Sequence, residues 1–259
     1  MINLINSVKK LIMQAGEIAL AKKRLGLKID KKIDQSVVTD ADIEISDLIF
    51  TTLSKLYPLL PIICEERPLY QLNTDNFWLI DPIDGTRSYS KNKESYTINI
   101  CLIENGSPKL GFIYQPELAK LYYTDHQGNL AVEQQGSIIT SLNPVRSNMI
   151  AAVSSKNLNS MTKNFLEVNH IHEITSMASS IKFCLVADGT VDVYPRFDEI
   201  MEWDVGAGHA LIKAIGGEVV DLDNKPLTYN KPFFKHPKFI AYGKKWLETA
   251  NKKAANECI

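Results

Sequence analysis

An apolar run that ends in two aspartates constrains this 259-residue chain more than any other stretch. Residues 77–89 are FWLIDPIDGTRSY, so Asp81 and Asp84 leave a strand-like segment with only Pro82 and Ile83 between them. Pro82 has a fixed φ and pushes the residue before it towards extended geometry. We expect a turn here that directs both carboxylates, together with the carbonyl of Ile83, to one side.

Other acidic residues follow apolar segments in a similar way. Glu65 and Glu66 come directly after LLPIIC, while Asp42 and Asp204 stand at the starts of two predicted helices. Taken singly, the two aspartates are ordinary helix N-caps and the glutamates an ordinary solvated turn. Taken together with the pair at 81 and 84, they predict a carboxylate cluster.

Such a cluster has a definite chemistry. Like charges about 4 Å apart repel by about 4 kcal/mol at an effective dielectric of about 20, so the cluster must take up protons or bind cations. All-oxygen ligands without His or Cys suit Mg²⁺. Gly85 and Thr86 follow directly, and free backbone N–H groups there would receive a phosphate. The combination predicts metal-assisted hydrolysis of a phosphate ester.

The composition excludes several classes of binding partner. The formal net charge of −1 provides no broad basic field for polymeric nucleic acid or an anionic membrane. No run approaches 18 apolar residues, so we expect no transmembrane segment, and Lys9 and Lys10 interrupt the apolar N-terminus, so we expect no signal peptide. The cysteines form no C-x-x-C pair and predict buried free thiols in a reducing cytoplasm. They are Cys64, Cys101, Cys184 and Cys258.

The pattern of apolar residues predicts a change of architecture near residue 145. Before it, helical periodicity predicts helices at 3–24 and 41–56, and the segments that follow predict an antiparallel sheet. The predicted strands are LLPIIC, FWLID, YTINICLIENG and KLGFIYQPELAKLYYTD. After it, strands and helices alternate, which favours an α/β arrangement. We therefore predict an α+β metal-binding half at 1–144 and an α/β substrate-recognition half at 145–259, with the junction at NPVRSN, 143–148.

Three motifs in order resemble the inositol monophosphatase superfamily, the lithium-sensitive, Mg²⁺-dependent phosphatases. They are EE at 65–66, DPIDGT at 81–86 and WDVGAG at 203–208, and VTDAD at 38–42 resembles an upstream motif of the same family. The resemblance spans nearly the whole chain. It implies the layered α-β-α-β-α sandwich of that superfamily, a mixed α+β and α/β fold with the active site between the two halves.

The resemblance also implies roles for residues at the matching positions. Two or three Mg²⁺ ions would be held by Glu65, Asp81, the Ile83 carbonyl, Asp84 and Asp204. Asp42 and Thr86 would orient and deprotonate the attacking water, with Glu66 in support. Gly85 and Thr86 would hold the phosphate through backbone N–H groups.

Within the superfamily, residues 179–197 resemble the 3′(2′),5′-bisphosphate nucleotidases of the CysQ type. These enzymes of sulfur metabolism remove the 3′-phosphate from 3′-phosphoadenosine 5′-phosphate. Ser179 and Ser180 would then contact ribose or phosphate, and Lys182 and Arg196 would accept the non-reacting 5′-phosphate. Lys182 as an exposed helix cation and Arg196 in a solvated loop remain open alternatives.

Rival interpretations remain at this stage. An inositol-1-phosphatase is the nearest, a fructose-1,6-bisphosphatase is further off, and a catalytically silent sensor of nucleotide or metal belongs to another class. We expect a small nucleotide bisphosphate as the partner, a cytoplasmic location, and no polymeric nucleic acid. Peripheral attachment to the cytoplasmic face of the inner membrane and assembly as a homodimer are left open.

Overall fold

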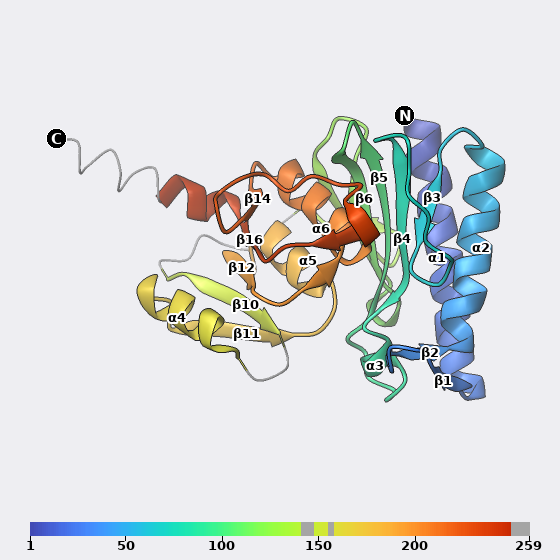
Figure 1. Cartoon of the computed structure of the whole chain (residues 1–259), viewed down its shortest axis with the longest axis horizontal. Coiled ribbons are helices and arrows are strands. Elements are labelled where there is room, and N and C mark those ends of the chain that lie inside the picture. Colours follow the sequence, from blue (N-terminus) through green and yellow to red (C-terminus); the bar gives the residue numbers. More distant parts are fainter. Residues whose placement is uncertain (141–147, 155–157, 250–259) are drawn as a thin grey trace.

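Two long helices cover one face of the larger β-sheet in the computed structural model, which describes residues 1–140, 148–154 and 158–249 (Figure 1). α1 (Ile2–Leu25) and α2 (Asp40–Leu56) agree with the predicted bounds to within one residue at each end. Their buried faces pack on the sheet through residues such as Ile12 and Ile45. A short antiparallel pair, β1 (Ile29–Lys31) with β2 (Val37–Thr39), connects the two helices and was not predicted.

The larger sheet has seven strands in the order in which they occur in the chain. The strands are β3 (Ile62–Cys64), β4 (Phe77–Asp84), β5 (Thr97–Glu104), β6 (Ser107–Gln115), β7 (Lys120–Thr124), β8 (Leu130–Gln134) and β9 (Ser137–Ile138). β3 and β4 are parallel and the other pairs are antiparallel. The prediction of one strand across KLGFIYQPELAKLYYTD is wrong, because the 3₁₀ turn η1 (Pro116–Leu118) and the left-handed Ala119 separate β6 from β7.

The second half contributes a smaller, five-stranded sheet with the order β11-β10-β12-β16-β14. Its strands are β10 (Ile150–Ser154), β11 (Glu173–Met177), β12 (Val193–Arg196), β14 (Glu218–Asp221) and β16 (Phe239–Tyr242). A further pair, β13 (Ile200–Met201) with β15 (Lys235–His236), lies outside this sheet. The segments MIAAVSS, TVDVYP, EVVDL and KFIAYG predict β10, β12, β14 and β16, whereas β11, β13 and β15 were not predicted. α4 (Ser160–Val168) and the helical residues 244–249 lie on the outer face of the smaller sheet (Figure 1).

Helices α5 (Ile181–Ala187) and α6 (Glu202–Ala214) lie between the two sheets (Figure 1). α6 is apolar on nearly all sides, which is typical of a helix that is buried all round. Its close packing depends on glycine, since a Cβ on Gly208 would lie 2.2 Å from the ring of Phe183. The five layers are thus α1/α2, the larger sheet, α5/α6, the smaller sheet and α4 with the C-terminal helix, which confirms the predicted α-β-α-β-α sandwich.

The remaining predictions about the chain have mixed outcomes. Cys64, Cys101 and Cys184 are buried free thiols as predicted, and Cys258 lies outside the described residues. Most of the predicted junction, 143–148, also lies outside them, and the two-half division stays a prediction. Among the described helices, none combines the length and the apolarity that a bilayer crossing requires.

Candidate metal centre and substrate pocket

A β-bulge places Asp81 and Asp84 on the same face of the larger sheet. Residues three apart on a regular strand point to opposite faces. Here Asp81 pairs with Asn99 and Asp84 with Thr97, so β4 uses one residue more than β5 over this interval. The expected turn between the two aspartates is therefore wrong. The strand continues through Asp84, and the bulge around Pro82, which cannot donate a ladder hydrogen bond, brings both carboxylates to one side.

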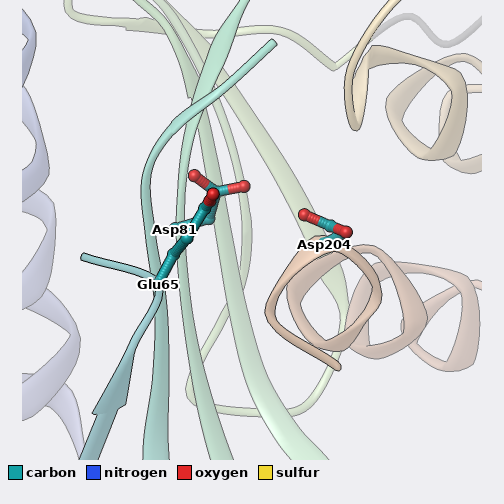
Figure 2. Close-up of side chains that lie close together, drawn as sticks. All are labelled: Glu65, Asp81 and Asp204. Carbon is teal, nitrogen blue, oxygen red and sulfur yellow. The ribbon is translucent and has the colours of Figure 1, made fainter. Parts of the chain in front are cut away.

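Three of the predicted metal ligands meet in space. Glu65 follows β3, Asp81 lies on the neighbouring β4, and Asp204 lies in the first turn of α6 across from them (Figure 2). Each offers one carboxylate oxygen, and these oxygens all lie within 4.8 Å of one another. The backbone N–H of Met201 donates to Asp204 at 3.1 Å and fixes its orientation.

The carboxylate of Asp81 lacks a counter-charge in the described part of the chain. The residue is 1% exposed, and among the described residues no N–H group or hydroxyl donates to its oxygens; the one side-chain contact of this kind is with the neighbouring carboxyl group of Asp204. Burial raises the pKa of Asp81 well above its usual value, and the neighbouring carboxylates raise it further. Burial likewise raises the pKa of Asp204. A buried carboxylate without donors is the arrangement that a bound cation would satisfy, and the all-oxygen ligand set fits Mg²⁺.

Asp84 lies beside this group but is held differently. Its Oδ2 accepts from the backbone N–H of Ser180 at 2.5 Å and from the Ser180 hydroxyl. Among the described residues no hydrogen bond reaches its Oδ1, so this oxygen remains available for a cation. The predicted ligand role of Asp84 is compatible with this geometry and stays a prediction.

The side chains of Asp42 and Thr86 are in contact, and their catalytic role stays a prediction. Asp42 is 1% exposed at the start of α2, where it accepts from the backbone N–H of Thr39 at 2.8 Å and from its hydroxyl at 2.6 Å. The hydroxyl of Thr86 lies 3.2 Å from the other Asp42 oxygen and 2.9 Å from the carbonyl oxygen of Ile83. Burial raises the pKa of Asp42 to about 6. The N-cap of α2 is Thr39, so the N-cap alternative for Asp42 is wrong; Asp42 is the third helical residue and accepts from Thr39 in a capping box.

Gly85 starts the short helix α3 (Thr86–Tyr89) in a conformation that only glycine adopts easily. Its φ is +94°, and a Cβ would lie 3.1 Å from the carbonyl oxygen of Ser95 and 3.3 Å from the Cβ of Ser179. The close approach to Ser179 joins the β4–α3 segment to the second half of the chain. The backbone here is thus fixed at the wall of the substrate cavity.

Lys32 approaches the metal centre from the β1–β2 segment, which the sequence did not indicate. Its ammonium lies 2.8 Å from Glu65 and 2.6 Å from Glu66. The Glu66 side chain is 5% exposed, and burial raises its pKa to about 7. Glu65 and Glu66 therefore share the charge of one lysine, and the supporting role of Glu66 stays a prediction.

A cavity of about 520 Å³ opens beside Asp84 and Asp204. The predicted substrate residues other than Thr86 line it together, along with cations that the sequence analysis missed. The lining includes Gly85, Arg87, Ser179, Ser180, Lys182, Tyr194, Arg196, Glu199 and Lys235. Four of these side chains are basic, while Glu199 lies 3.6 Å from Lys235. The cavity therefore combines carboxylates at one end with cations along its walls.

The structure decides between the two readings of Lys182. This residue is 4% exposed, so the exposed-cation alternative is wrong. Its ammonium donates to the carbonyl oxygens of Met177 at 3.2 Å and Ser179 at 2.6 Å, and it lies 5.1 Å from the centre of the Tyr194 ring. Burial lowers the pKa of Lys182 to about 8. Arg196 ends β12, and its buried Nε makes no hydrogen bond within the described residues.

Comparison with known proteins assigns the family. The model of the inositol monophosphatase family matches residues 3–257. The chain belongs to the inositol monophosphatase family. The predicted family is thereby confirmed.

Relatives within this family are known by sequence and by structure. The 3′(2′),5′-bisphosphate nucleotidase CysQ of Buchnera aphidicola is 36% identical over 208 residues, which cover 79% of this chain and 78% of the relative. The protein of the same name from Escherichia coli K12 is 35% identical over 219 residues, covering 82% and 88%. The crystal structure of CysQ from Bacteroides thetaiotaomicron superposes with a TM-score of 0.82 at 30% identity, covering 94% of this chain and 98% of that one.

Proposed function

We propose that this chain is a Mg²⁺-dependent phosphomonoesterase that hydrolyses the 3′-phosphate of 3′-phosphoadenosine 5′-phosphate to give AMP and phosphate. One observation carries the reaction class: the buried Asp81 carboxylate, to which no N–H group or hydroxyl of the described residues donates, lies with Glu65 and Asp204 next to a cation-lined cavity. The substrate is proposed because the CysQ relatives carry the name of bisphosphate nucleotidases.

The ligands proposed for two or three Mg²⁺ ions are oxygen atoms only. Glu65, Asp81 and Asp204, whose oxygens lie within 4.8 Å of one another, would hold the ions, and Asp84 and the Ile83 carbonyl would complete the ligand set. Bound there, Mg²⁺ supplies Lewis-acid stabilisation of the phosphoryl oxygens and lowers the pKa of a bound water. The bound ions would neutralise the negative charge of the cluster and so stabilise the folded site.

Thr86 is the proposed positioning group for the attacking water. Its hydroxyl has one proton and two acceptors within reach, Asp42 and the Ile83 carbonyl. If the Ile83 carbonyl is used as a metal ligand, the proton goes to Asp42, and the lone pairs of the Thr86 oxygen are left to accept from water. Asp42 is then placed to take up a proton through Thr86, with Glu66 in support.

The second half of the chain is proposed to bind the rest of the nucleotide. Backbone N–H groups at Gly85 and Thr86 would hold the reacting phosphate, and Ser179 borders the same cavity. Arg196 is the proposed ligand of the 5′-phosphate, since its Nε is buried without a partner and a guanidinium suits bidentate phosphate binding. Lys182, held by two carbonyls, adds positive charge behind it.

The test is phosphate release with Mg²⁺ from 3′-phosphoadenosine 5′-phosphate, inositol 1-phosphate and fructose 1,6-bisphosphate side by side. We expect the nucleotide to be preferred, and Arg196→Gln to raise its KM much more than that of inositol 1-phosphate. Lys163→Gln, at an exposed position on α4, is the matched control. Preference for inositol phosphate would refute the substrate, and Mg²⁺ binding without turnover of any substrate would indicate the silent sensor.

Location and assembly are separate proposals. We propose a cytoplasmic enzyme without polymeric nucleic acid as a partner. Peripheral membrane attachment and a homodimer stay predictions, which fractionation and sedimentation would test.

A further inference from the structure

Asn99 is a buried polar residue that no step of the proposed reaction uses. It stands in the otherwise apolar stretch INICLI of β5 and is 1% exposed. It is the direct cross-strand partner of Asp81. Cross-strand partners share a face of the sheet with Cβ atoms about 5 Å apart. A buried amide at this position therefore borders the metal centre.

The amide group of Asn99 connects two residues of the site. Its Nδ2 donates to the hydroxyl oxygen of Ser180 at 2.8 Å and lies 3.4 Å from Oδ2 of Asp84. The hydroxyl of Ser180 in turn donates to the same Asp84 oxygen. Ser180 has only one hydroxyl proton, and with an N–H donor on its oxygen lone pair that proton goes to Asp84 Oδ2, which is nearer than the other acceptor, the carbonyl oxygen of Asp204 at 3.2 Å. Oδ2 of Asp84 is thereby occupied by protein donors, which leaves Oδ1 for a cation.

The other end of the amide is unsatisfied. Oδ1 of Asn99 is buried and accepts no hydrogen bond from the described residues. A buried acceptor without a donor costs about 1–3 kcal/mol. Mg²⁺ in proteins usually keeps several of its waters, which are donors only. A water bound to the cation near Asp81 would supply the hydrogen-bond donor that Oδ1 of Asn99 lacks.

We propose that Asn99 is a positioning residue of the metal centre. Its Nδ2 orients Ser180 and, through it, Asp84, while its Oδ1 accepts from a metal-bound water. The residue thus connects α5, which carries the cavity-lining Lys182, to the cation site. The inference rests on the metal centre of the proposed function and is independent of the identity of the substrate.

The test measures metal binding to the substrate-free protein, with Mn²⁺ as the probe. Free Mn²⁺ is quantified by electron paramagnetic resonance for the wild type, Asn99→Leu and Thr124→Val. Thr124 is the matched control because it is a 3% exposed polar residue of the same sheet, on β7, that accepts from the backbone N–H of Gly111 at 3.2 Å. Loss of a residue that orients a metal ligand weakens binding by about 10–100-fold. We expect that loss for Asn99→Leu and unchanged binding for Thr124→Val, although both variants lose stability in urea.

A double-mutant cycle then separates positioning from a merely structural role. If Asn99 acts through Ser180, the Asn99→Leu/Ser180→Ala variant binds Mn²⁺ about as weakly as the weaker single variant. Unchanged Mn²⁺ affinity in Asn99→Leu, or effects that multiply in the double variant, would overturn the inference. If Asn99→Leu does not fold, Asn99→Ser is measured in its place with the same expectations. Absence of Mn²⁺ binding by the wild type would instead refute the metal centre itself, and this inference with it.

Discussion

Replacing Asp81 by Asn should stabilise the metal-free protein while abolishing its activity. Asp81 is buried, accepts no hydrogen bond, and has the oxygens of Glu65 and Asp204 within 4.8 Å. At that separation and an effective dielectric of about 20, each pair of charges repels by about 3.5 kcal/mol. With all three groups ionised, two pairs would repel by about 7 kcal/mol, but the raised pKa values of Asp81 and Asp204 mean that protonation near neutral pH relieves much of this repulsion. The ion pair between Lys32 and Glu65, at 2.8 Å, and the partial exposure of Glu65 reduce it.

A net gain of about 2–4 kcal/mol is therefore expected in EDTA at alkaline pH, where the cluster is ionised, because asparagine removes both repulsions and its amide can donate to either neighbour; the gain shrinks as the pH falls and the raised pKa values leave the carboxyl groups protonated. For a chain of this size that corresponds to a rise of about 5–10 °C in Tm. The assay is thermal and urea unfolding of both proteins with EDTA and with Mg²⁺. Mg²⁺ should raise the Tm of the wild type and have little effect on the variant, whose site has lost a ligand.

Asp188→Asn is the control, because it changes another buried aspartate and we expect it to change the Tm in the opposite direction. Asp188 is also buried, at 7% exposure, but it accepts from the hydroxyl of Tyr122 at 2.8 Å and from the hydroxyl of Thr190 at 2.6 Å. Its neutralisation should lower the Tm in both buffers, because satisfied hydrogen bonds to a charge are lost. A lower Tm for Asp81→Asn in EDTA would refute the inference that the buried Asp81 carboxylate destabilises the protein when no cation is bound.

Three other predictions concern different parts of the molecule. Lys32→Gln should strengthen Mg²⁺ binding by a few fold, since it removes the ammonium that competes for Glu65, and weaker binding in a calorimetric titration would contradict this. Gly85→Ala should cost about 1–3 kcal/mol more in urea unfolding than Gly128→Ala, because both have positive φ but only Gly85 has atoms within 4 Å of an added Cβ. The buried His209 has its pKa lowered by burial to about 3. The unfolded chain therefore binds a proton below about pH 6.5 that the folded chain does not, and stability falls as the pH falls. His209→Gln should remove about 2 kcal/mol of the loss between pH 6.5 and 5 in urea titrations, and an unchanged slope would exclude His209 as its source.

The long elements were predictable because their periodicity extends over many residues. The apolar spacing of α1 covers six turns, so its bounds at Ile2–Leu25 differ from the prediction by one residue at each end. β11 (Glu173–Met177) was missed because it is largely exposed and has no apolar alternation. β13 and β15 have two residues each, which is too short for any period to be visible. The order of the five layers came from the family resemblance, since periodicity alone does not say which sheet a buried helix such as α6 contacts.

In the candidate site, too, some residues were predictable from the sequence and others were not. The carboxylates that meet were visible as acids after apolar runs, and Glu65, Asp81 and Asp204 do come together. Lys32 was not visible, because it lies in the segment KIDKKID, where several lysines are equivalent until the β1–β2 pair directs one of them towards Glu65. Asn99 left a trace in the sequence, as a lone polar residue inside the apolar run INICLI. A polar side chain in an otherwise buried strand needs a hydrogen-bond partner, so the sequence already indicated that Asn99 contacts another polar group.

The bulge in β4 shows why the motif cannot be understood from spacing alone. Two carboxylates three residues apart face opposite sides of a regular strand, so a shared site requires either a break in the strand or an extra residue in it. The register of Asp81 with Asn99 and of Asp84 with Thr97 shows that the chain uses the extra residue. Pro82 is suited to that place, because a residue without N–H leaves no ladder donor unpaired when the strand bulges. The rigid DPID backbone thus serves the chemistry directly: it keeps two negative charges together in the sheet, where a flexible loop would let them separate.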